Sequence, residues 1–158
     1  GGAHNYSVNV FSTATFSPSI VSVFESIPYA TERWDIGGLH DPVTNNSRLT
    51  VPAGGAGIWG VWFNVLEIER TAITNRIIFR SGINGTVTRG VEASPGSTLG
   101  TPAQSFYTEF DLSSGDYVEV FMFVNSTVGC ILGSPGDSEG GVGINGNWTI
   151  GAIYLNIT

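Results

Sequence analysis

Hydrophobic and polar side chains alternate along this chain in short stretches. The clearest stretch spans residues 104–112, where a mainly apolar face alternates with a polar face. The first face holds Phe106, Thr108, Phe110 and Leu112, and the second holds Ser105, Tyr107, Glu109 and Asp111. A period of two is typical of a β-strand with one buried face. Residues 6–11 alternate in the same way, so both stretches are predicted to be half-buried strands.

Two further stretches, residues 58–66 and 117–124, are apolar on both faces. In the first, Trp59, Val61, Phe63 and Val65 share one face, and Ile58, Gly60, Trp62 and Leu66 share the other with Asn64. A strand of this kind needs a cover on each side. One cover would be a second sheet. The other must be another element of the same chain or another copy of it.

Turn residues separate these stretches and predict an all-β fold. Asn84-Gly85 is a strong hairpin signal, and it links an apolar stretch at 73–83 to a returning strand at 86–91. Another apolar stretch lies at 20–29, and a last strand is expected at 147–157. Strands about ten residues apart, with turns between them, predict a sandwich or a barrel. Eight or so strands favour a jelly roll.

The pattern gives no sign of a second folding unit. We find no internal repeat and no linker, so residues 1–158 are expected to form a single domain, with residues 1–15 as an N-terminal strand or arm. Loops rich in Gly, Ser and Pro are expected at 94–104 and 133–146.

Composition agrees with a β-rich fold and limits the partners. The chain has 22 Gly and 7 Pro, no lysine, six arginines and a net charge of −7. A surface with this charge repels phosphate groups, so we expect neither a nucleic-acid partner nor an anionic membrane. No apolar run reaches the ~20 residues of a spanning helix, so membrane insertion is not expected either.

A set of short motifs, in a fixed order, resembles a known family. The motifs are Ile27-Pro28-Tyr29, Glu32-Arg33-Trp34-Asp35, His40-Asp41-Pro42, Asn46-Ser47-Arg48-Leu49-Thr50-Val51-Pro52, Gly57 with the aromatic strand after it, Leu112-Ser113-Ser114-Gly115-Asp116-Tyr117-Val118, and Trp148-Thr149-Ile150-Gly151-Ala152-Ile153-Tyr154-Leu155. Together they resemble the C1q/TNF-like domains, and more narrowly the C1q-like domains of bacteriophage virion proteins. The resemblance covers nearly all of the chain from about Phe16 onward. The chain departs from the animal members in having no collagen-like stalk and no cysteine pair.

The resemblance implies a ten-strand jelly-roll β-sandwich that forms a homotrimer around a threefold axis. By analogy with the family, Trp62 would face that axis, beside Ser105, Tyr107 and Glu109 of the 104–112 strand. The alternative is that both faces of the 58–66 strand are buried within one chain under loops.

The resemblance also implies a non-enzymatic function. The chain would be a structural module on the virion surface, either the knob of a fibre or spike or a capsid decoration. Its partners would be its own copies, other virion proteins, and a host-surface glycan or protein bound through the loops at 94–104 and 133–146. The alternative is a secreted, extracellular C1q/TNF-like ligand or a soluble lectin.

Signals for catalysis are weak. Gly136-Asp137-Ser138-Glu139-Gly140-Gly141 is similar to the nucleophile loop of chymotrypsin-like proteases, but a glutamate is inserted after the serine. The histidines are His4 and His40, and neither is placed as a general base in a recognisable motif. We therefore expect no catalytic residues. Cys130 lies in an apolar segment and is expected to be a buried small hydrophobic residue.

Metal binding and glycosylation are the remaining candidates. Potential ligands in turns are Asp35, His40, Asp41, Asp116, Asp137 and Glu139. They lack the spacing of a calcium loop, and aspartates in turns commonly cap backbone amides. We therefore expect no cofactor, with calcium as the alternative. Glycosylation sequons begin at Asn5, Asn45, Asn84, Asn125, Asn147 and Asn156. We favour the interpretation that they are silent, as in a protein made in a bacterium.

Overall fold

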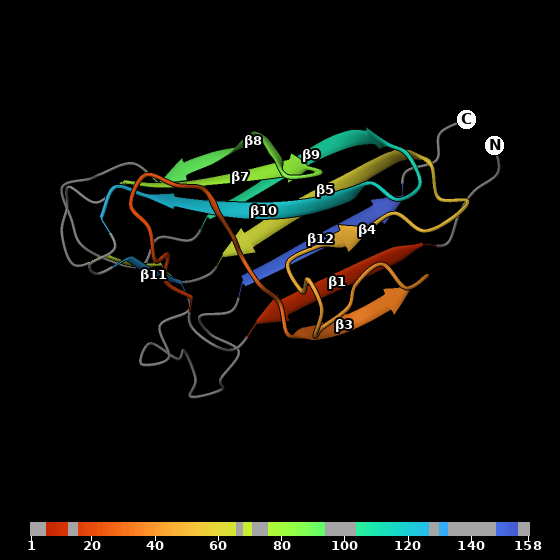
Figure 1. The fold of residues 1–158 in the computed structure, drawn as a ribbon, viewed down its shortest axis with the longest axis horizontal. Coiled ribbons are helices and arrows are strands. Elements are labelled where there is room, and N and C mark those ends of the chain that lie inside the picture. Colours follow the sequence, from red (N-terminus) through yellow and green to blue (C-terminus); the bar gives the residue numbers. More distant parts are fainter. Residues whose placement is uncertain are drawn as a thin grey trace.

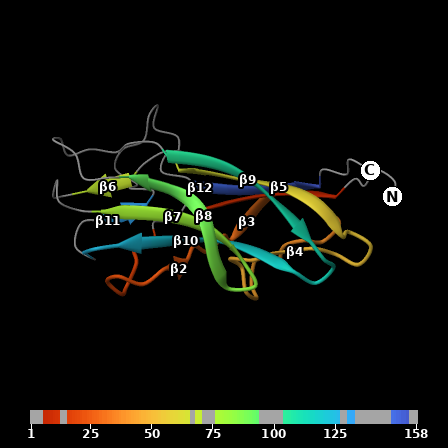
Figure 2. The ribbon, with the colours of Figure 1, turned by 90° about the horizontal axis from the view of Figure 1, so that it is seen from above.

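The fold is all-β and consists mainly of two five-stranded antiparallel sheets that face each other. The computed structural model describes residues 6–12, 16–65, 68–70, 76–93, 104–126, 130–132 and 148–154. In these residues every regular element is a strand. Figure 1 shows the strands, and Figure 2 shows the two layers edge-on, with β5, β9 and β12 in one layer and β4 and β10 in the other.

The first sheet has the strand order β3-β1-β12-β5-β9. Its strands are β3 (Thr31–Ile36), β1 (Ser7–Ser12), β12 (Trp148–Tyr154), β5 (Gly57–Val65) and β9 (Gln104–Leu112). The second sheet has the order β2-β10-β7-β8, and β4 also pairs with β10. Its strands are β2 (Glu25–Ser26), β10 (Tyr117–Val124), β7 (Ile77–Ile83), β8 (Thr86–Ala93) and β4 (Leu49–Thr50). The short strands β6 (Ile68–Arg70) and β11 (Cys130–Leu132) form a separate ribbon.

These two sheets confirm the predicted jelly-roll sandwich. All of the pairings are antiparallel, and strands distant in sequence lie side by side, as where β12 runs between β1 and β5. The two sheets hold five strands each, which are the ten strands expected.

The core lies between the sheets and includes the inward faces of β1, β5, β7, β9 and β10. Trp59, Val61 and Phe63 of β5 are almost fully buried, as are Val120 and Met122 of β10. The rings of Phe63 and Phe79 meet across the core with their centroids 5.1 Å apart. Each large apolar side chain buried in this way contributes roughly 1.5–3 kcal/mol to folding.

The outer face of the second sheet is covered by the chain itself. The ring of Phe24 lies 5.1 Å from that of Phe123, centroid to centroid. The Ser47 hydroxyl donates to Oε2 of Glu119 at 2.5 Å, and the amide of Ile27 donates to the carbonyl of Val120 at 2.9 Å. The apolar character of both faces of β10 therefore has an explanation within one chain.

Two segments differ from what the sequence pattern indicated. The apolar stretch at 20–29 is not a long strand, because only Glu25–Ser26 pairs with β10. Ile20 is instead 53% exposed, in a segment that turns at Ser22 with a φ of 61°. The second difference is β3, which forms in the polar segment 31–36 because it pairs with β1 at the edge of the first sheet.

Candidate interaction surface

The outer face of the first sheet carries one row of residues that crosses all five strands. In strand order the row is Trp34, Asn9, Gly151, Trp62 and Tyr107. Residues directly opposite each other in an antiparallel pair point to the same face. The two tryptophans and the tyrosine therefore share one face. Gly151, in the middle of the row, has no side chain.

This face exposes large apolar side chains. Tyr107 is 54% exposed, Trp34 43% and Ile36 54%, and Trp62 is half-buried. Single exposed apolar residues are ordinary, whereas a group of aromatic residues on one sheet face marks an interaction site. Unlike the outer face of the second sheet, it is not covered by any of the described segments.

The residues predicted to face a threefold axis lie together on this surface. Trp62 is directly opposite Tyr107, and Glu109 is two positions further along β9. The Tyr107 hydroxyl donates to Oε1 of Glu109 at 3.4 Å. Partial desolvation, then the charge and hydrogen bond of Glu109, raises the pKa of Tyr107. Ser105 pairs with Asn64, two positions along β9 from Tyr107, and its side chain lies outside the described ones.

The other half of the surface, on β1 and β3, was not predicted. Nη1 of Arg33 donates to Oδ1 of Asn9 at 2.9 Å, and its guanidinium lies 4.5 Å from the ring centroid of Phe11. Nε1 of Trp34 donates to the Ser7 hydroxyl at 3.0 Å. These contacts fix the β3 side chains against β1. The sequence signal that could have indicated this strand is the spacing of two between Trp34 and Ile36.

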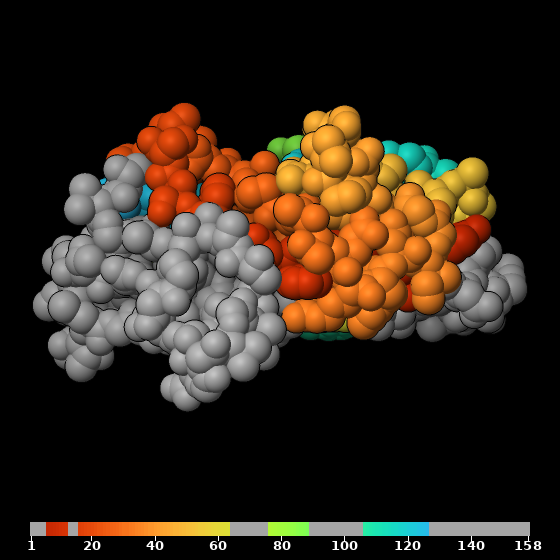
Figure 3. Space-filling model, turned by 90° about the horizontal axis from the view of Figure 1, so that it is seen from below, coloured from red at the N-terminus to blue at the C-terminus, as the bar shows by residue number. Residues whose placement is uncertain are grey.

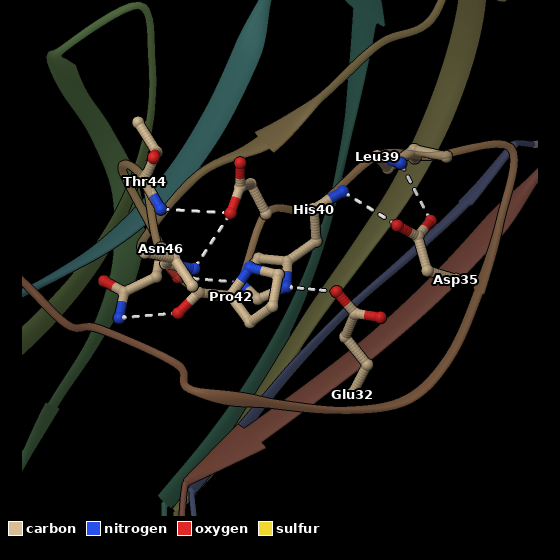
Figure 4. A network of polar contacts seen from close by, with 9 residues as sticks. Glu32, Asp35, Leu39, His40, Pro42, Thr44 and Asn46 are labelled. Carbon is tan, nitrogen blue, oxygen red and sulfur yellow. Dashed lines mark hydrogen bonds and ion pairs between the residues drawn. The ribbon is translucent and has the colours of Figure 1, made fainter.

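A second polar arrangement surrounds His40 (Figure 4). Nδ1 of His40 lies 2.8 Å from Oε1 of Glu32, and Nε2 donates to the carbonyl of Asn46 at 2.9 Å. The His40 side chain is fully buried. Both ring nitrogens are therefore engaged in tying the 37–47 segment to β3. That geometry is structural, because neither nitrogen is available to a reacting group.

The aspartates of this region cap backbone amides, as predicted. Asp35 accepts from the amides of Leu39 and His40 at 2.8 and 3.0 Å. Oδ1 of Asp41 accepts from the amides of Val43 and Thr44 at 2.9 and 3.0 Å. The two amides, that of Thr44 first, lower the pKa of Asp41.

Asp116 has the same role at the start of β10. Its Oδ2 accepts from the amide of Ser113 at 2.8 Å, and its Oδ1 accepts from Nδ2 of Asn84 at 2.9 Å. These bonds, that of Asn84 first, lower the pKa of Asp116.

Within the described ranges no three His, Cys, Asp or Glu side chains gather as metal ligands. Asp137 and Glu139 lie outside those ranges, and so do His4 and the 136–141 loop.

A pocket of about 420 Å³ opens beside the His40 segment. It is lined by Gly38, Leu39, His40, Asp41, Pro42, Thr44, Asn45, Arg48 and Thr50. The guanidinium carbon of Arg48 lies 4.1 Å from the ring centroid of Tyr117. The sequence did not predict this pocket. The loops expected to bind ligands, at 94–104 and 133–146, fall almost entirely outside the described residues.

The architecture is that of a C1q/TNF-like jelly roll. The globular domain of zebrafish complement 1qA superposes with a TM-score of 0.64 at 10% identity, covering 98% of this chain and 100% of that one. Murine APRIL, a TNF-family protein, has a TM-score of 0.60 at 12% identity in its structure at pH 8.5, with 95% of this chain and 98% of that chain covered. The pH 5.0 structure of murine APRIL gives 0.60 at 14% identity with the same coverage.

No family model and no curated protein sequence matches the chain. At these identities the structural likeness establishes the fold alone. Among the described residues there is no helix with the length and hydrophobicity needed to cross a membrane.

Proposed function

We propose that this chain is a non-enzymatic binding module that assembles as a homotrimer through the outer face of its first sheet. One observation carries the proposal, namely that Trp34, Trp62 and Tyr107 share a sheet face that the described residues leave uncovered. The outer face of the second sheet, by contrast, is covered by contacts within the chain, at Phe24 and Ser47. A second copy is the cover that the first sheet lacks.

The two edges of the surface are chemically different and complementary. The β9 edge presents Tyr107 with two exposed carboxylates, Glu109 and Asp111. The β3 edge presents the exposed Arg33 and Trp34. A ring closed by rotation brings unlike edges of neighbouring copies together, so each acidic edge can face a cationic edge. Trp62 would then lie nearest the axis, between the two edges.

The assembly is tested with one variant in the face and one outside it. Trp62→Ser removes an aromatic anchor, and we expect at least a ~100-fold weaker association, as for central aromatic residues of interfaces. Val43→Ser is the matched control, because Val43 is 85% exposed on the far segment around residues 41–47, which protrudes in amber in Figure 3. Sedimentation velocity from 0.1 to 50 µM would measure both. Equal association of the two variants would contradict the assignment of this face.

We further propose that the trimer is a virion structural module, a fibre or spike knob or a capsid decoration, formed by residues 1–158 as a single domain. The support is the resemblance of its motifs to the C1q-like domains of bacteriophage virion proteins, together with the jelly-roll fold. Other virion proteins would hold it, and exposed loops would bind a host-surface glycan or protein. Electron microscopy of the source particle labelled with antibody against the trimer should show it on the capsid or the tail.

The second candidate is a secreted C1q/TNF-like ligand or lectin. The observation that favours it is the superposition on zebrafish complement 1qA and murine APRIL. An unlabelled particle, with the protein recovered instead from the medium of producing cells, would support this candidate against the virion role.

A further inference from the structure

The pocket beside the His40 segment is lined in part by Arg48, a cation with no carboxylate partner among the described residues. The guanidinium carbon of Arg48 lies 4.1 Å from the ring centroid of Tyr117, which is a cation–π contact. Within the described part of the chain, no ion pair or hydrogen bond to its guanidinium is present. Arg48 is also a lining residue of the pocket, and its guanidinium N–H donors have no hydrogen-bond partner among the described residues. A planar guanidinium of this kind matches a carboxylate with two parallel hydrogen bonds.

The rest of the lining suits hydroxyl groups. Oδ1 of Asp41 is used by two backbone amides, which hold the carboxylate in position and leave Oδ2 without a hydrogen bond to any described residue. Thr44, Asn45 and Thr50 add side chains that donate and accept. Ligand pockets generally measure about 300–1,000 Å³. A volume of about 420 Å³ is enough for one or two sugar rings rather than for a protein segment.

We infer that this pocket binds a sugar unit that carries a carboxylate. The carboxylate would pair with Arg48, and sugar hydroxyls would donate to Asp41 and bond with Thr44 or Asn45. This inference rests on the proposed binding function and names its ligand class and its site. A simple anion is less suitable, because Asp41 repels it, whereas a hydroxyl group beside Asp41 gains a charge-assisted hydrogen bond.

The pocket stays open when the first sheet is covered. Thr50 belongs to β4, which pairs with β10 in the second sheet. Figure 2 shows β4 in the layer opposite β5 and β9. A trimer built on the first sheet therefore presents three such pockets. Single sugar units bind weakly, and three linked pockets raise the apparent affinity for a polymeric glycan by about 10²–10⁴.

The test is a titration of ¹⁵N-labelled trimer with D-glucuronic acid, followed by amide shifts. The matched ligand is its methyl ester, which keeps the sugar hydroxyls and removes the charge, and acetate is the carboxylate without a sugar. We expect shifts concentrated at residues 38–50 with the acid, and at least tenfold weaker binding of the ester and of acetate. N-acetylneuraminic acid serves as a second carboxylate sugar.

Two variants locate the site. Arg48→Gln should weaken glucuronic acid binding at least tenfold, while Arg76→Gln, the same charge change at an exposed arginine outside the pocket, should leave it unchanged. Asp41→Asn keeps the Arg48–Tyr117 contact and should weaken binding about threefold or more. It tests the pocket independently if the Arg48→Gln variant does not fold.

Three outcomes would overturn the inference: no shifts at 20 mM of either acidic sugar, equal binding of ester or acetate, or unchanged binding by Arg48→Gln. Light scattering on the same samples separates this inference from the proposed assembly. A trimer that binds no acidic sugar refutes only the pocket. A monomer that binds through Arg48 refutes only the assembly.

Discussion

At the scale of single residues, the core contains two polar aromatic side chains in contrasting situations. Nε1 of Trp59 donates to the carbonyl of Gly55 at 2.9 Å in a buried setting. The Tyr29 hydroxyl is equally buried and has no hydrogen-bond partner among the described residues, and burial raises its pKa well above the usual value. Both residues lie in apolar stretches of the sequence. Only the structure shows that the polar atom of Trp59 is hydrogen-bonded and that of Tyr29 is not.

The two residues give opposite expectations for replacement by phenylalanine. Trp59→Phe loses the bond, leaves a buried carbonyl acceptor and opens a cavity, so we expect it to lower the free energy of unfolding by about 2–4 kcal/mol. Tyr29→Phe removes an unpaired buried hydroxyl, and we expect a change of no more than about 1 kcal/mol, or a gain. Urea unfolding of both variants measures the difference. A larger loss from Tyr29→Phe would contradict this account of the core.

Asp116 gives the expected dependence of stability on acid. Because its pKa is lowered in the folded chain, its contribution to stability is complete above the unfolded value of about 3.9 and is lost as the pH falls through the folded pKa. Asp116→Asn removes the charge that Asn84 and Ser113 stabilise. We expect the variant to melt below wild type at pH 7, with the difference narrowing toward pH 3. A difference that is constant from pH 7 to pH 3 would show that the carboxylate charge has no part in it.

At the scale of elements, the sequence predicted best the strands whose alternation is set by burial. The expected boundaries of β9 and β10 coincide with the structure, and β5 begins and ends within one residue of the expected stretch. The strand β3 was missed because its half-buried and exposed positions are polar and its pairing with β1 is a long-range contact. The stretch at 20–29 was misjudged because hydrophobicity alone does not report a turn.

The candidate surface was predicted in part for the same reason. Trp62, Tyr107 and Glu109 follow from the alternation of two strongly patterned strands and the register between them. Arg33, Trp34 and Phe11 join them only through the fold. The pocket at Arg48 depends on how the 37–48 segment returns to β4, which local sequence does not determine.

Gly82 tests the pairing of β7 with β8. The register shifts between Ser81 and Gly82, and a Cβ at Gly82 would lie 2.4 Å from the Thr86 carbonyl oxygen and 2.9 Å from Cε2 of Phe121. We expect Gly82→Ala to cost at least about 2–3 kcal/mol, because a backbone atom must move. Gly38→Ala is the control, since it meets no atom within 4 Å and pays only for its φ of +72°, about 1 kcal/mol. Chemical unfolding of both variants makes the comparison, and equal costs would contradict the close packing at Gly82.

At the scale of the whole molecule, the two sheets differ in how their outer faces are covered. The outer face of the second sheet is covered in part by the segments around Phe24 and Ser47, whereas the first sheet presents aromatic side chains from both of its edges. In the proposed trimer, an acidic chain with a net charge of −7 would gain by pairing its exposed arginine edge with the carboxylate edge of another copy. The proposed self-association would account for the exposed aromatic residues and for the uncovered face of the first sheet.

The mass of the wild-type protein in solution tests this central claim most directly. Light scattering coupled to size-exclusion chromatography at micromolar concentration should give one species with three times the 16.7 kDa mass of the chain. A stable monomer under the same conditions would contradict the account of the first sheet.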